Sequence, residues 1–177
     1  MARQDIAAAL KRVASIFSRR PEAAFQGDAP AIVQWQGGLR FKATHQNGTS
    51  VLTDMPTELG GTGDQVSPGW LVRAGLAACT ASCIALAAAT KGIELDTLEV
   101  KATSQSDARG MLGIATADGE TVYPGPHDVQ LHVRISARGV APQRLRTLVE
   151  ESNRRAPITA AFKTALEVSL HIEIEGA

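Results

Sequence analysis

Residues 67–91, SPGWLVRAGLAACTASCIALAAATK, predict the central helix of the fold. Ser67 suits the N-cap, and Pro68 suits the first helical position, where a missing N–H costs nothing. Lys91 ends the pattern and a glycine follows it, which is typical of a helix C-terminus. No charged side chain lies between Arg73 and Lys91. We therefore expect this helix to be surrounded by protein.

A membrane-spanning helix is the alternative for this stretch. The uncharged run falls short of the roughly 20 apolar residues that a bilayer needs, and it contains Thr80, Ser82 and several alanines. The N-terminal residues lead into an amphipathic segment rather than an apolar signal core, which argues against secretion. We expect a cytoplasmic protein without a membrane segment.

The composition indicates one compact domain with an appendage. The chain has 177 residues, and its 18 basic side chains balance its 18 acidic ones, so no strong field attracts nucleic acid or an anionic membrane. Both cysteines, Cys79 and Cys83, lie four residues apart on the central helix. Side chains at that spacing sit about 5–6 Å apart, whereas a disulfide needs Cβ atoms near 4 Å. We expect two reduced thiols.

The remaining patterns predict short strands separated by turns and helices. Residues 5–20 form an amphipathic stripe, and residues 21–30 are a linker. We expect residues 1–30 to be an N-terminal helix with its linker, and residues 31–177 to be the main domain. Strands are predicted at residues 31–35, 39–44, 50–53, 94–104, 129–135 and 168–174, and further helices at residues 142–153 and 157–166.

This order predicts an α+β fold in which antiparallel sheets pack on the buried central helix and on a second helical pair. Turns at Gly37-Gly38 and Asn47-Gly48 join the first three strands into an antiparallel meander. Residues 54–66 form a glycine-containing loop that lacks the Lys-Ser/Thr pair of a phosphate-binding loop.

Cys79 is the candidate nucleophile. It lies about three turns into its helix, where the helix dipole has faded, so a cation from another segment must lower its pKa. The candidate cations are Arg40, Arg73, Arg109, Arg154 and Arg155. The ordinary alternative is a small buried cysteine that serves as a hydrophobic residue. Arg109 can simply pair with Asp107 on its own loop.

The histidines show no metal-ligand spacing, and no nucleotide-binding motif is present. We therefore predict no metal and no cofactor.

Four motifs are similar to those of the OsmC/Ohr family. They are PTELGG at residues 56–61, SPGWLVRAGLAAC at 67–79, Gly92-Ile93 before a strand, and RAPI at 155–158 before a short helix. The resemblance runs from about residue 31 to the C-terminus. It implies an intertwined α+β homodimer with the site between the subunits. In peroxidase members, the cysteine that matches Cys79 attacks an organic hydroperoxide and becomes a sulfenic acid, which a second cysteine resolves as a disulfide before a dithiol reduces it.

This chain departs from that pattern at two positions. Ala156 stands where the family has its resolving cysteine, and Gly69 stands where it has the glutamate that orients the activating arginine. Arg40 is the nearest equivalent of that arginine, offset by about one position.

Two functions therefore remain open. The first is a one-cysteine, thiol-dependent hydroperoxide reductase in which Cys79 is the nucleophile, Arg40 or Arg109 stabilises its thiolate, and an external thiol is the reductant. The second is a non-catalytic dimer that binds a small apolar ligand in the cleft between subunits. In both, the N-terminal helix is expected to extend the dimer contact or to cover the cleft.

Overall fold

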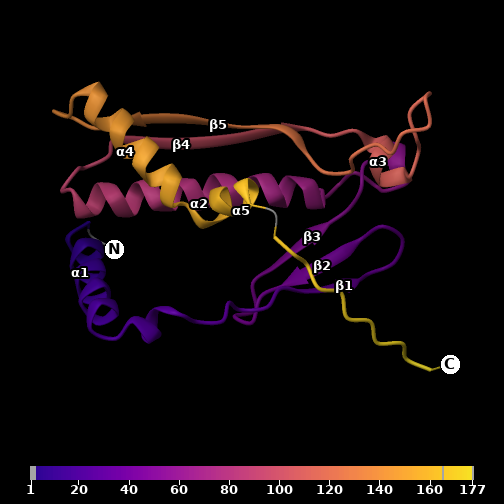
Figure 1. Ribbon diagram of the computed structural model, residues 1–177, viewed down its shortest axis with the longest axis horizontal. Coiled ribbons are helices and arrows are strands. Elements are labelled where there is room, and N and C mark those ends of the chain that lie inside the picture. The colour runs from indigo at the N-terminus through magenta and orange to yellow at the C-terminus, as the bar shows by residue number, and fades with distance from the viewer. Residues whose placement is uncertain (1–2, 165, 177) are drawn as a thin grey trace.

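A computed structural model describes residues 3–164 and 166–176. The helices are α1 (Arg3–Arg19), α2 (Pro68–Thr90), α3 (Ala108–Leu112), α4 (Pro142–Arg155) and α5 (Pro157–Lys163), and the strands are β1 (Ile32–Trp35), β2 (Phe41–Thr44), β3 (Ser50–Thr53), β4 (Thr97–Gln105) and β5 (His127–Ser136). Figure 1 shows β4 and β5 as a long ribbon on one side of α2, with α1 and the small β1–β3 sheet on the other side. The fold is α+β with antiparallel sheets, as the sequence predicts.

The ends of α2 confirm the predicted caps. The Ser67 side chain accepts a hydrogen bond from the backbone N–H of Trp70 at 3.2 Å, and Pro68 is the first helical residue. Lys91 is the C-cap, and Gly92 follows with a φ of 68°. Glycine is the residue that adopts this left-handed conformation without a steric cost, so it ends the helix.

One face of α2 forms the core of the chain. Leu76, Thr80, Ile84 and Ala88 repeat every four residues and are all buried, because this face packs against β4, α4 and α5. Leu148 of α4 is 1% exposed and belongs to the same apolar core as Ile84.

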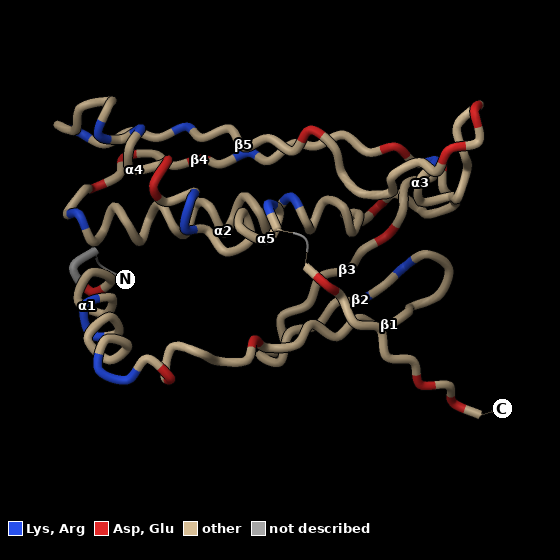
Figure 2. The backbone as a smooth tube through the Cα atoms, in the orientation of Figure 1, with Lys and Arg blue, Asp and Glu red and all other residues tan. Residues whose placement is uncertain are grey.

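The opposite face of α2 is open in the single chain. The large side chains there are Val72 and Leu86, which are 49% and 42% exposed. Within one chain, protein therefore does not surround α2 on every side, because the sheet, α4 and α5 cover one face and α1 covers only part of the rest. α2 is long and apolar enough to cross a membrane by length and composition alone, which is weak evidence because core helices of soluble proteins share these properties. Figure 2 shows α2 in tan over most of its length, and acidic and basic residues intermixed elsewhere.

The small sheet is the predicted meander, in the order β1-β2-β3. Gly37, Gly38 and Gly48 have φ values of 102°, 55° and 89°, which explains the glycines at its turns. The second sheet pairs β4 with β5, and Val100 lies opposite Val133. β4 begins at Thr97, three residues later than predicted.

Two predictions in the last third of the chain are wrong, one for the end of a helix and one for a strand. α5 ends at Lys163 rather than at residue 166, and residues 168–174 form no strand. They run in an extended path away from the core (Figure 1), because no neighbouring strand in the described part of the chain pairs with them. The short helix α3, capped by Asp107, was not predicted.

Candidate functional site

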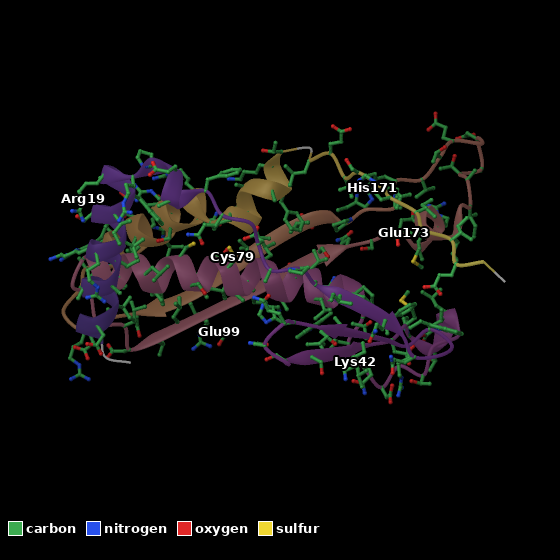
Figure 3. The ribbon with its side chains drawn as sticks, turned by 90° about the horizontal axis from the view of Figure 1, so that it is seen from below. Arg19, Lys42, Cys79, Glu99, His171 and Glu173 are labelled. Atoms are coloured by element: carbon green, nitrogen blue, oxygen red, sulfur yellow. The ribbon has the colours of Figure 1, made fainter. Side chains whose placement is uncertain are left out.

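Cys79 lies where α5 crosses α2. Two of its neighbours on α2 contact α5: a Cβ at Gly75 would lie 3.7 Å from Cδ1 of Ile158, and the Thr80 hydroxyl lies 3.4 Å from the Thr159 hydroxyl. Thr80 is fully buried, whereas Cys79 keeps partial exposure. Figure 3 shows Cys79 near the middle of α2, with Lys42 and Glu173 toward the end of the molecule opposite Arg19. A small reactant therefore has access to one side of the Cys79 thiol.

The sequence fixes where α5 begins. Pro157 is its first residue, and Ala156 just before it is fully buried. Proline suits this position, because it restarts a helix in which its missing N–H is not needed. The Thr159 hydroxyl donates a hydrogen bond to Oδ1 of Asn153 at 3.1 Å, which ties α5 to α4. The methyl group of Ala156 therefore occupies the packed corner where the resemblance places a second cysteine.

The two thiols of α2 are both free and differ in environment. Burial raises the pKa of the Cys83 thiol, and the charge of Cys79 and a hydrogen bond to it raise that pKa further. A neighbouring thiolate disfavours a second negative charge. Cys83 is therefore poorly placed to act as the thiolate nucleophile.

Arg40 is engaged by a polar cluster on the loop of residues 54–66. Its guanidinium donates to Oδ2 of Asp54 at 3.4 Å, to the Thr62 hydroxyl at 2.8 Å, and to Asp64. The hydrogen bond to Asp64 is the main reason why the pKa of Arg40 is raised, and hydrogen bonds from Thr62 lower the pKa of Asp54. Arg40 therefore holds the loop against the β1–β2 hairpin.

Glycine is required at one point of this loop. Asp54 is 3% exposed and accepts hydrogen bonds from the backbone N–H groups of Met55 and Thr62. A Cβ at Gly61 would lie 1.9 Å from the carbonyl oxygen of Met55 and 2.8 Å from Asp54 Oδ1. Only glycine lets the chain close around the Asp54 carboxylate, which gives a physical reason for the second glycine of the PTELGG motif.

Arg109 pairs with Asp107, as its place on the same loop predicts. Both oxygens of the carboxylate accept hydrogen bonds from the guanidinium, at distances of 2.6 to 3.1 Å. These bonds lower the pKa of Asp107 to about 2. In residues 3–164 and 166–176, the side-chain hydrogen bonds of Arg40 and Arg109 thus run to carboxylates and Thr62, and none joins either residue to Cys79.

Two other candidate cations lie along α2. Arg73 donates to the Ser104 hydroxyl at 3.3 Å, and its Nη1 would lie 3.7 Å from a Cβ at Gly69. Arg155 lines an apolar groove of about 480 Å³ between α1, α2 and α4, together with Cys83. The amphipathic helix α1 thus covers part of α2 near Cys83 rather than near the β1–β3 sheet.

Sequence reasoning did not single out Asp54, Thr62 or Asp64. These residues lie in a stretch rich in polar residues and glycines between a strand and a helix. That pattern predicts a loop, but it does not indicate that the loop binds Arg40. Across the described ranges, no three His, Cys, Asp or Glu side chains gather in a way that would hold a metal ion.

Comparison with known proteins identifies the family. The OsmC-like protein family matches residues 61–171, which is more than half of the chain. A search of curated proteins finds no match.

Solved structures share the fold. They include an OsmC-like protein from Mycoplasma pneumoniae, with 18% identity over 78% of this chain and 89% of the other, and a TM-score of 0.64. An organic hydroperoxide resistance protein from Elizabethkingia anophelis has 23% identity over 78% and 90%, with a TM-score of 0.59. An organic hydroperoxide resistance protein OsmC from Legionella pneumophila has 22% identity over 78% and 92%, with a TM-score of 0.57. The chain belongs to the OsmC-like protein family.

Proposed function

We propose that this protein is a one-cysteine, thiol-dependent hydroperoxide reductase of the cytoplasm, with Cys79 as its nucleophile. The observation that carries the proposal is that the two thiols lie in different environments. Cys79 is partly exposed where α5 crosses α2, and its neighbour Cys83 has a raised pKa. The proposal is also supported by relatives of the same fold that are named for organic hydroperoxide resistance.

The first chemical step needs only the Cys79 thiolate and the hydroperoxide. The sulfur attacks the terminal oxygen, the S–O bond forms as the O–O bond breaks, and the leaving alkoxide takes a proton to become an alcohol. Cys79 is oxidised by two electrons to a sulfenic acid, which is the first step of thiol oxidation.

Reduction then requires an external thiol, because Ala156 supplies no sulfur. One thiol attacks the sulfenic sulfur, forming a mixed disulfide and releasing water. A second thiol attacks that disulfide, restores Cys79 and leaves as a small disulfide. One hydroperoxide and two thiols thus give one alcohol, one disulfide and one water.

We also propose that the working unit is a homodimer. β1 exposes Ile32, Val33 and Trp35 by 58%, 58% and 67%, and the C-terminal segment exposes Val168 and Ile174 by 88% each. Apolar exposure on an edge strand and on an alternating extended segment is a liability that proteins cover with a partner. A second subunit would cover these surfaces and bring a cation, Arg40 or Arg109, to the Cys79 thiolate.

Light scattering during size-exclusion chromatography tests the dimer. The full chain should have the mass of a dimer, and deletion of residues 167–177 should leave monomers or aggregates. A monomeric full chain that stays in solution would contradict this part of the proposal.

Consumption of cumene hydroperoxide in the presence of dithiothreitol tests the enzyme. Wild type and Cys83→Ser should consume the peroxide, and Cys79→Ser should do so no faster than buffer, because it lacks the nucleophile. Equal rates for wild type and Cys79→Ser would rule out the proposed reaction.

The second candidate is a dimer that binds a small apolar ligand without chemistry. The hydrogen bonds of Arg40 and Arg109 favour it, because carboxylates already neutralise both cations. It predicts a rise in melting temperature with lipophilic compounds, together with no loss of peroxide.

A further inference from the structure

A small, mostly apolar cavity lies at the start of α2, and neither cysteine lines it. Its volume is about 160 Å³, and Arg73 lies in its wall. Cys79 lies six positions after Arg73, which places the two side chains about 120° apart around a helix of 3.6 residues per turn. Gly69 and Arg73 thus line the cavity, and Cys79 does not.

The Arg73 guanidinium is half-buried and has no carboxylate partner. Within residues 3–164 and 166–176, its side-chain hydrogen bond runs to the Ser104 hydroxyl at 3.3 Å, and no ion pair involves it. This differs from Arg40 and Arg109, which carboxylates hold. A partly desolvated cation with free donors favours an anion, because an ionic hydrogen bond recovers the lost hydration.

The sequence keeps space open beside this guanidinium. Gly69 lies one helical turn before Arg73, and a Cβ at Gly69 would already lie 3.7 Å from Nη1 of Arg73. A longer side chain at this position would extend toward the guanidinium. Ser106, which is exposed, adds a second hydroxyl to the cavity wall.

The rest of the wall is apolar and leads into a larger groove. Val129 and Phe162 line the cavity and also line an adjoining groove of about 870 Å³, which Leu76 and Leu131 extend. The two spaces thus place Arg73 and two hydroxyls beside a run of apolar side chains, in a groove that Asn153, Lys163 and Thr164 also line. Such a surface matches a molecule with an anionic head and an apolar tail.

We propose that Arg73, Ser104 and Ser106 bind the carboxylate of an amphipathic organic acid, whose hydrocarbon tail lies along Val129 and Phe162. A carboxylate fits better than a phosphate, because its single charge matches one guanidinium and its planar oxygens match the two parallel N–H donors. This site does not depend on thiol chemistry at Cys79, so either proposal can fail without the other.

Calorimetric titration of the full chain with octanoate tests the site. Octanoate should bind to the wild type, and Arg73→Gln should weaken its binding by ~10-fold or more, because the variant loses a charged hydrogen bond. Arg73→Lys should restore part of the affinity. Arg144→Gln is the matched control, because Arg144 is exposed on α4, and it should bind octanoate like the wild type.

Three further outcomes decide the assignment. Octanol and inorganic phosphate should both bind more weakly than octanoate. Octanol lacks the negative charge, and phosphate lacks the hydrocarbon tail. If phosphate or octanol binds as tightly as octanoate, the amphipathic carboxylate is the wrong ligand. Ser106→Glu keeps the test valid if Arg73→Gln fails to fold: its new carboxylate should occupy the guanidinium and abolish octanoate binding, and unchanged binding to this variant would overturn the proposal.

Discussion

Replacing Thr80 with valine tests the contact that fixes α5 beside Cys79. The Thr80 hydroxyl is fully buried and lies 3.4 Å from the hydroxyl of Thr159, which is 6% exposed. Valine keeps the shape and removes the hydroxyl. The Thr159 hydroxyl still donates to Asn153, so the substitution leaves no donor without a partner. The cost should therefore equal one neutral hydrogen bond, about 1 kcal/mol of unfolding free energy.

Urea unfolding measures this cost, and thermal unfolding should show a melting temperature lower by about 2–4 °C. Thr90→Val is the matched control, because the Thr90 hydroxyl is exposed and bonds to Leu86 of its own helix. Its effect should stay within about 0.5 kcal/mol. Equal stability of Thr80→Val and Thr90→Val would refute the reasoning.

Three more predictions follow from individual side chains. Leu148→Ala should lower the free energy of unfolding in urea by about 2–5 kcal/mol, because Leu148 is 1% exposed. Leu112→Ala, at a position that is 55% exposed, should lower it far less, and equal losses would place the core elsewhere. In Cys79→Ser, iodoacetamide should label Cys83 with a pH midpoint above the usual value of about 8.5, because burial raises its pKa; a midpoint at or below that value would contradict this environment. Asp107 should titrate with a pKa of about 2 by NMR. Because this folded-state pKa is below the unfolded value, the stabilisation is complete above about pH 4 and is lost as the pH falls toward 2. At pH 4, pepsin should therefore cut the loop of residues 107–126 faster in Asp107→Asn than in the wild type, and the two rates should converge near pH 2; equal rates at pH 4 would contradict this role of Asp107.

Local signals predicted much of this molecule. The caps of α2 depend on Ser67, Pro68 and Gly92, whose effects act within one helical turn, and they are confirmed. The meander follows from glycines at its turns, and the ion pair of Arg109 with Asp107 follows from their proximity on one loop. Each of these features depends on residues that are close together in the sequence.

Features that depend on distant partners were missed or misjudged. Arg40 meets Asp54 and Asp64, which lie 14 and 24 residues away, and no periodic pattern indicates such a pairing. The alternation in residues 168–174 predicts a strand, but a strand also needs a neighbour, and the described chain offers none. The five residues of α3 are too few for a helical pattern to emerge.

The site itself was predicted in part. The sequence identifies Cys79 as the candidate nucleophile, and its position on α2 follows from the caps. The crossing of α5 beside it depends on packing between Thr80 and Thr159, which are 79 residues apart. Within the described residues, the hydrogen bonds of Arg40 and Arg109 run to other partners than Cys79, so these two roles stay predictions.

Trapping of the sulfenic acid tests the central claim most directly. The protein is treated with one equivalent of cumene hydroperoxide in the presence of dimedone, and its peptides are analysed by mass spectrometry. We expect a dimedone adduct on Cys79 in both the wild type and Cys83→Ser. An adduct on Cys83 alone, or no adduct on either cysteine, would contradict it.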